Sequence, residues 1–68
     1  MPKEEVQRLK ELYQKEVVPS VREKIADVMS GYGEEAIPDL IECADAEIVP
    51  SNREHILGKI MEIKGLTH

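Results

Sequence analysis

The chain has little of what small proteins commonly use to hold a fold together. It is 68 residues long, with no tryptophan, no phenylalanine, two tyrosines and one cysteine. Cys43 cannot form an internal disulfide bond, which excludes a disulfide-stapled secreted mini-protein. The N-terminus carries charge rather than a signal-like apolar run, and no segment reaches the roughly 18 apolar residues of a membrane span. These absences predict a soluble cytoplasmic protein with a single domain over residues 1–68.

Basic residues are missing from the middle of the chain. The net charge is −5, and residues 33–52 contain six acidic residues and no lysine or arginine. Nucleic-acid binding requires Lys and Arg to displace the counterions of the phosphates. Docking on anionic lipid requires positive charge for the same reason. The charge distribution therefore predicts no nucleic-acid partner and no membrane partner.

What the chain does contain is an internal repeat with an offset of 31 residues. Residues 4–25 align without a gap with residues 35–56 and give ten identities in 22 positions, where average composition predicts about one or two. The identical pairs are Glu4/Glu35, Leu9/Leu40, Glu11/Glu42, Glu16/Glu47, Val18/Val49, Pro19/Pro50, Ser20/Ser51, Arg22/Arg53, Glu23/Glu54 and Ile25/Ile56. Such an offset is typical of stacked supersecondary units. We expect repeat one at residues 3–33 and repeat two at residues 34–65.

Apolar residues recur with a period near 3.6 in four segments, and no segment shows strand alternation. The pattern predicts an all-α protein with helices at residues 3–17, 21–30 and 35–46 and a fourth helix that ends before Gly65. Pro38 must then lie in the first turn of its helix. The residues expected on the buried stripes are Val6, Leu9, Leu12, Tyr13, Val17, Val21, Ile25, Val28, Met29, Ala36, Ile37, Leu40, Ile41, Ala44, Ile56, Leu57, Ile60, Met61 and Ile63.

The connections between the helices carry their own signals. The segments Ser20–Glu23 and Ser51–Glu54 each have the sequence of a capping box, in which a serine and a glutamate exchange hydrogen bonds at a helix start. Gly31 and Gly33 are expected to end the second helix in the left-handed conformation. Arg22 and Arg53 follow the two serines at the same place, and we expect each to bond the facing loop within its own repeat.

Residues 21–29 (Val-Arg-Glu-Lys-Ile-Ala-Asp-Val-Met) and 31–42 (Gly-Tyr-Gly-Glu-Glu-Ala-Ile-Pro-Asp-Leu-Ile-Glu) resemble a HEAT repeat. More narrowly, they resemble the short HEAT-like repeats of the phycobilisome-lyase type. Two positions depart from that pattern: Val-Pro-Ser replaces the usual Asp-Pro before Val-Arg, and Asn52 replaces the valine of the second copy. The resemblance implies an α-solenoid fragment of two stacked helical hairpins, working as a scaffold that presents a surface to other proteins. Chromophore chemistry does not follow from the repeat alone.

Few residues are candidates for chemistry. Cys43 aligns with Leu12 and is expected to be a small buried hydrophobe, with nearby acids that raise its pKa and disfavour a nucleophile. Glu54-His55 invites comparison with the His-Glu pairs of HEAT-repeat di-iron hydroxylases, but it is a single pair in reversed order. His55 is therefore expected to face solvent, and His68 is terminal. The sequence predicts no catalytic, cofactor-binding or metal-binding residue, and no enzyme.

The predicted function is a non-catalytic protein–protein interaction or scaffold module, as a small subunit or adaptor. Two surfaces are candidates for partner binding. An acidic surface, which is either a solvated outer face or a docking site for a basic partner protein, consists of Glu34, Glu35, Asp39 and Glu42. An apolar surface on the last helix, expected to be covered in a homodimer or in a complex with a partner, consists of Leu57, Ile60 and Met61. The alternative is an accessory subunit that assists cofactor or metal binding in an enzyme complex. The initial Met1 and the glycine after the last helix favour a whole protein over a piece of a longer array.

Overall fold

The computed structural model describes residues 2–66, which form four α-helices and one short 3-10 turn. The helices are α1 (Pro2–Lys15), α2 (Pro19–Ser30), α3 (Ile37–Ala46) and α4 (Pro50–Lys64), and the 3-10 turn η1 (Gly33–Ala36) precedes α3. No residue between 2 and 66 is in a strand. The predicted all-α class with four helices is therefore confirmed.

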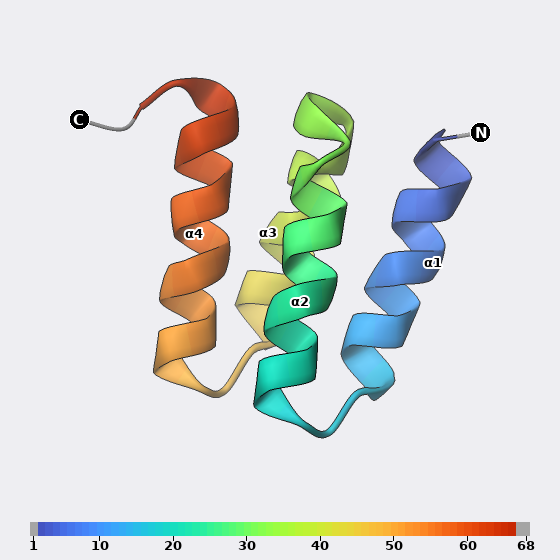
Figure 1. Cartoon of the computed structure of the whole chain (residues 1–68), viewed down its shortest axis with the longest axis vertical. Coiled ribbons are helices and arrows are strands. Elements are labelled where there is room, and N and C mark those ends of the chain that lie inside the picture. The colour runs from blue at the N-terminus through green and yellow to red at the C-terminus, as the bar shows by residue number, and fades with distance from the viewer. Residues whose placement is uncertain (1, 67–68) are drawn as a thin grey trace.

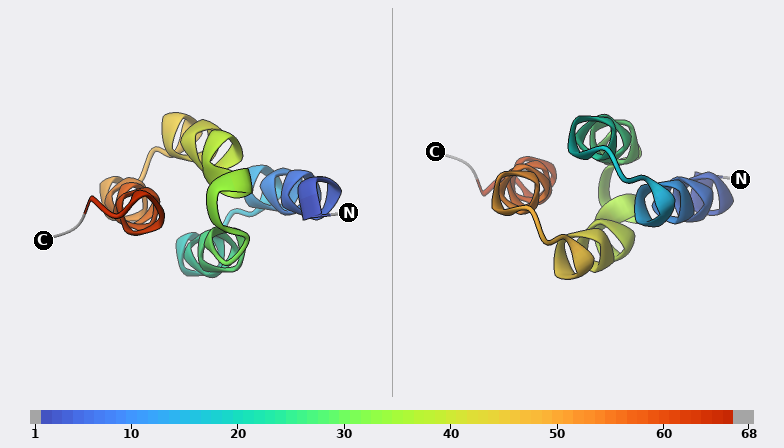
Figure 2. Two further views of the ribbon diagram at one scale, coloured as in Figure 1. Left: turned by 90° about the horizontal axis from the view of Figure 1, so that it is seen from above. Right: turned by 90° about the horizontal axis from the view of Figure 1, so that it is seen from below.

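The four helices alternate in direction, with α1 and α4 on opposite sides of the molecule and α2 and α3 between them on opposite faces (Figures 1 and 2). α1 contacts α2 and α3, α4 contacts α2 and α3, and α1 and α4 make no contact with each other within the described residues. Figure 2 looks along the helices and shows α1 and α4 at opposite ends of the molecule. We call α1 with α2 the first pair and α3 with α4 the second pair. The connections within both pairs lie at the same end of the molecule (Figure 1).

The two turns within the pairs start their second helices with a proline and not with a capping box. Pro19 and Pro50 are the first residues of α2 and α4, and the preceding Val18 and Val49 are extended, with no side-chain hydrogen bond at either cap. Proline suits this position because its φ is already helical and the first helical N–H has no partner to lose. The predicted capping boxes are wrong, and both helices begin earlier than predicted.

The connection between the pairs uses one left-handed glycine. Gly31 caps α2 with φ −65°, which is a right-handed value, whereas Gly33 has φ +72°. The prediction of a left-handed Gly31 is therefore wrong, and Gly33 alone makes the reversal that leads into η1. Pro38 lies in the first turn of α3, as predicted. Gly65 ends α4 in the left-handed conformation with φ +72°, also as predicted.

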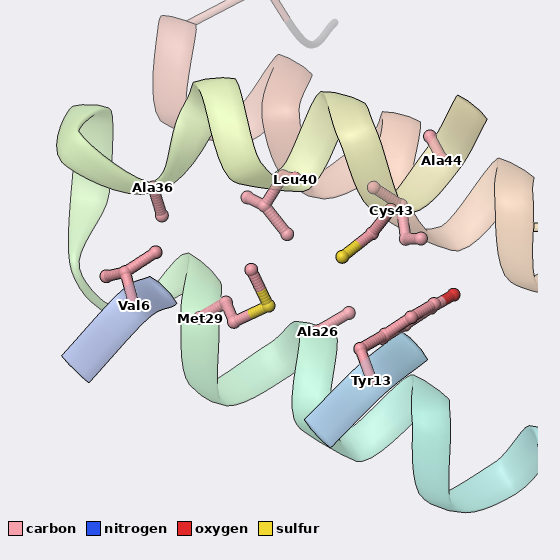
Figure 3. Close-up of a cluster of buried hydrophobic side chains, with 9 residues drawn as sticks. Val6, Tyr13, Ala26, Met29, Ala36, Leu40, Cys43 and Ala44 are labelled. Atoms are coloured by element: carbon pink, nitrogen blue, oxygen red, sulfur yellow. The ribbon is translucent and has the colours of Figure 1, made fainter. Parts of the chain in front are cut away.

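The core lies where the two pairs meet (Figure 3). Its buried members are Val6, Tyr13, Ala26, Met29, Ala36, Leu40, Cys43, Ala44 and Ile56. Leu9, Ile25, Tyr32, Ile60 and Ile63 pack against this cluster from its edge. The close-up shows the sulfur atoms of Met29 and Cys43 directed into the space between α2 and α3. The core joins the pairs because no single pair of amphipathic helices can cover its own apolar stripe.

Several residues expected on the buried stripes are instead exposed. On the first pair these are Leu12, Val17, Val21 and Val28, and on the second pair they are Ile41, Leu57 and Met61. All except Val17, which lies in a turn, are on helices and have the apolar side chains of an interior position. Leu12, Leu57 and Met61 lie on α1 and α4, which have no further helix on their outer sides. Val21, Val28 and Ile41 lie on parts of α2 and α3 that no other described helix covers. Their exposure is the largest correction to the sequence-based expectations.

Candidate functional site

The turn inside each pair is built by the same local chemistry. The carboxylate oxygen Oε2 of Glu16 accepts a hydrogen bond from the backbone N–H of Val18 at 3.1 Å. The Oε2 atom of Glu47 accepts the equivalent bond from the N–H of Val49 at 2.9 Å. Each glutamate thus satisfies the backbone donor that precedes a helix beginning with proline. The identities at these positions of the repeat have a direct structural cause.

The repeated arginines close the same turns from the other side. Arg22 donates from Nη1 to the carbonyl oxygen of Glu16 at 2.9 Å. Arg53 donates to the carbonyl oxygen of Glu47 from Nη2 at 2.8 Å and from Nε at 3.2 Å. The expected bonds from each arginine to the loop of its own repeat are confirmed. Each connection is therefore held by one glutamate and one arginine six positions later.

Glu47 does a second task that Glu16 does not, because it ties the two pairs together. Its carboxylate accepts hydrogen bonds from Arg22 Nε and Nη2, both at 2.9 Å, and from the Tyr13 hydroxyl at 2.5 Å. The Glu47 carboxylate is buried. A bidentate Arg–carboxylate pair is geometrically specific and stronger than a neutral hydrogen bond. We call Tyr13, Arg22 and Glu47 the inter-pair tie.

The charges of the inter-pair tie are reflected in its pKa values. Burial of the Glu47 carboxyl works to raise its pKa, but hydrogen bonds from Arg22, Tyr13 and the backbone outweigh burial and lower the pKa from 4.5 to about 2. Burial, followed by the hydrogen bond to Glu47, raises the pKa of Tyr13 well above its ordinary value of 10. Glu47 is thus ionised and Tyr13 neutral at physiological pH. The Glu16/Glu47 identity was one signal of this role that sequence reasoning could use, but nothing in the sequence indicated the long-range partners.

The predicted acidic surface is partly neutralised by a lysine from the first pair. Lys10 Nζ lies 3.1 Å from Glu42 Oε1 and 3.4 Å from Asp39 Oδ1. The Glu42 hydrogen bond raises the pKa of Lys10 above 10.5. Glu34 and Glu35 lie on η1 and are exposed. The four acids therefore separate into two that bind Lys10 and two that face solvent.

His55 lies between the pairs and not free in solvent. Its Nε2 is 2.6 Å from Asp27 Oδ1 and its Nδ1 is 3.6 Å from Glu23 Oε2, both on α2. Lys59 Nζ lies 3.7 Å from the same Asp27 oxygen. The expectation of a solvent-facing histidine is correct only in part: the side chain is half-buried because carboxylates of α2 contact it, while its hydrogen bond to Asp27 is exposed. His68 lies outside the described residues.

Cys43 is fully buried, as expected of a small hydrophobe. Burial is the main reason that its pKa rises to about 11, and the nearby Asp39 carboxylate raises it further. The thiol is therefore protonated at physiological pH. This environment agrees with the expectation of a raised pKa and an unreactive thiol.

The exposed apolar residues of the helices lie on the outer sides of the two pairs. Ile41, Leu57 and Met61 are 51%, 47% and 41% exposed on the outer side of the second pair, and we call them, with Arg53, the α4 end face. All of these except Met61 line a groove of about 520 Å³, together with Glu42, Ala44 and Asp45. Of the three predicted apolar contact residues, Leu57 and Met61 lie on this face, while Ile60 is half-buried and packs against the core.

Neither the described side chains nor known proteins point to a particular chemistry. Among residues 2–66, no three His, Cys, Asp or Glu side chains are grouped so that they could hold a metal ion. No helix in this part of the chain combines the length and apolar character needed to cross a bilayer. No family model, curated protein or solved structure matches the chain.

Proposed function

We propose that the chain is a non-catalytic protein–protein interaction module, built as two HEAT-like repeats, whose α4 end face contacts another protein. The observation that carries this proposal is the exposure of Ile41, Leu57 and Met61 on the α4 end face, which contains the groove. Exposed apolar patches with a polar border are characteristic of interaction sites. Arg53, at the edge of the same groove, supplies a charged group that selects an acidic contact.

The repeat architecture in this proposal is supported by the turn chemistry. Glu16 and Glu47 accept the same backbone bond, and Arg22 and Arg53 donate the same carbonyl bond, at an offset of 31 residues. α1 and α4 each contact α2 and α3 but not one another, a pattern that an open stack shares with a closed four-helix bundle, so the support for the repeat comes from the turn chemistry. An open stack leaves a face at each end for a partner.

The proposal is tested by affinity capture from the native cells with the whole chain as bait. We expect a protein, identified by mass spectrometry, that binds the unmodified chain and is lost with Leu57→Glu and Met61→Glu. Val17→Glu is the matched control, because Val17 is also an exposed apolar residue but lies in a turn away from the α4 end face. Charge reversal at Asp39 and Glu42 tests the acidic surface separately.

Two results would contradict the proposal. One is a set of captured proteins that does not change between the unmodified chain and the two α4 end-face variants. The other is a chromophore, metal or small molecule bound in stoichiometric amount, detected by mass and absorbance of the purified chain. The second result would favour an accessory subunit that assists cofactor or metal binding.

A further inference from the structure

We propose that the partner on the α4 end face is a second copy of this chain, docked head to tail by the same contact that joins its own two pairs. In this arrangement the second pair of one copy binds the first pair of the next. The surface used on the next copy consists of Leu12, Glu16, Val21 and Val28, which we call the α1–α2 end face. This inference rests on the proposed function, because it names the partner of the proposed interaction site.

The contact between the two pairs provides a template for the contact between copies. A shift of 31 positions moves Lys10, Tyr13, Arg22 and Ala26 onto Ile41, Ala44, Arg53 and Leu57. In the first group, Lys10 binds the acids of α3, Tyr13 and Arg22 bind Glu47, and Ala26 lies in the core. The second group lines the groove of the α4 end face. The groove on the second pair thus corresponds to the surface by which the first pair contacts the second pair.

The residues that the second pair contributes to the internal contact can be shifted by 31 positions in the same way. Cys43, Asn52 and Lys59 are the residues that the second pair brings to the first: Cys43 lies in the core, Asn52 donates to the Pro19 carbonyl at 2.9 Å and Lys59 lies near Asp27. Their counterparts 31 positions earlier are Leu12, Val21 and Val28. These three are 56%, 40% and 54% exposed.

The composition of these positions is the reverse of what burial requires. At five of these seven positions the residue at the internal contact is small or polar, and its counterpart 31 positions away is a large, exposed apolar residue. The exceptions are Tyr13, whose counterpart is Ala44, and Arg22, whose counterpart is Arg53. Surfaces that stay in water normally carry the polar residues, and a buried contact carries the apolar ones. The reversal is explained if the two end faces cover each other.

A charged pair gives the proposed contact its register. Arg22 uses Nη1 for the carbonyl of its own turn, which leaves its Nε–Nη2 edge for the Glu47 carboxylate. Arg53 has no such carboxylate in the described residues, and its Nε–Nη2 edge turns onto the carbonyl instead. Glu16 is the counterpart of Glu47, and its Oε1 atom accepts no hydrogen bond within residues 2–66. In the assembly, Arg53 adopts the arrangement of Arg22 and binds Glu16 of the next copy.

This contact joins two different faces, so a pair of copies still has one free α4 end face and one free α1–α2 end face. A heterologous contact of this type produces a growing row of copies or a closed ring, and not a two-fold symmetric dimer. The prediction therefore differs from a homodimer in which two α4 end faces meet.

The test uses two variants that each block one face. Leu57→Glu blocks the α4 end face and Val28→Glu blocks the α1–α2 end face, and both positions are exposed, so both variants are expected to fold by circular dichroism. In sedimentation equilibrium, the unmodified chain should show a mean mass that rises with concentration beyond that of a dimer or reaches one closed ring. Each variant alone should be monomeric, and an equal mixture should form a one-to-one complex and nothing larger.

Three outcomes would overturn the inference. The unmodified chain could stay monomeric up to millimolar concentration, the Val28→Glu variant could still dimerise alone, or the mixture of variants could fail to associate. If self-association fails while a different protein is captured through Leu57, the proposed function stands and only the identity of the partner is wrong. If neither association is found, the proposed function fails as well.

A charge exchange tests the register independently of the apolar contacts. Arg53→Glu and Glu16→Arg each place like charges opposite one another, which should weaken self-association about tenfold or more. Mixing the two variants restores an opposite pair at every contact and should recover the affinity. If either variant alone associates as tightly as the unmodified chain, the proposed Arg53–Glu16 pair is wrong.

Discussion

The two turns that join helices within the pairs have the same local structure and different roles. In both turns a glutamate accepts the backbone N–H two positions later, and an arginine donates to the carbonyl of that glutamate. The Glu16 turn lies at the edge of the molecule, whereas the Glu47 turn receives Arg22 and Tyr13 from the first pair. A residue that caps one turn locally thus becomes, one repeat later, the group that holds two helix pairs together.

The difference teaches how a small repeat protein can be stabilised without a disulfide or a large aromatic core. The buried cluster is modest, and its packing is non-directional. The inter-pair tie adds fixed donor and acceptor directions, so it selects one orientation of the second pair against the first. Three predictions test whether the two turns differ as described.

The largest effect is expected from removing the carboxylates. Glu47→Ala should lower the free energy of unfolding by about 3 kcal/mol or more, because it leaves the Arg22 guanidinium and the Tyr13 hydroxyl without their buried partner. Glu16→Ala removes one local hydrogen bond and should cost about 1 kcal/mol or less. Urea denaturation measures both. Equal losses in the two variants would show that Glu47 acts only within its own turn.

A smaller effect is expected from acid. The pKa of Glu47 is lowered to about 2 in the folded chain, so the unfolded chain binds this proton more readily. The stability contributed by Glu47 is complete above its ordinary pKa of 4.5 and is lost as the pH falls toward 2. Glu47→Gln should therefore flatten the stability profile between these pH values. A steep acid transition that persists in Glu47→Gln would refute the assignment.

The smallest effect is expected from the tyrosine hydroxyls. Tyr13→Phe removes a bond to the buried Glu47 carboxylate and should cost about 1.5 kcal/mol. Tyr32 donates to the exposed Glu5 carboxylate at 2.8 Å, which water can replace, so Tyr32→Phe should cost about 0.5 kcal/mol. Thermal unfolding of the matched pair of variants gives the comparison. The opposite order would mean that Tyr13 holds its place by ring packing alone.

The sequence was sufficient for the parts of the fold that depend on local chemistry. The helical period predicted four helices, Pro38 was placed in a first turn, and Gly65 was expected to end the last helix. Helix starts were less accurate, because proline at the first helical position competes with a capping box one residue later. Val18 and Val49 occupy the cap positions where the sequence favoured Ser20 and Ser51.

The sequence was not sufficient for contacts that depend on which helices are neighbours. Periodicity placed Leu12, Val28 and Ile41 on buried stripes, and each would be buried if another helix pair followed on its side. The role of Glu47 between the pairs could not be predicted, because Arg22 and Tyr13 are 25 and 34 positions away along the chain. The α4 end face was predicted in part through Leu57 and Met61, from an apolar stripe wider than one neighbour requires.

The buried Cys43 makes opening of the contact between the pairs measurable through a side chain that the protein already has. The thiol lies inside the core, and its pKa of about 11 leaves little of the reactive thiolate at neutral pH. An alkylating reagent can therefore modify it at an appreciable rate only in molecules in which α3 has moved away from the first pair. The rate of labelling therefore measures how often this contact opens, and each substitution in the inter-pair tie should increase that rate.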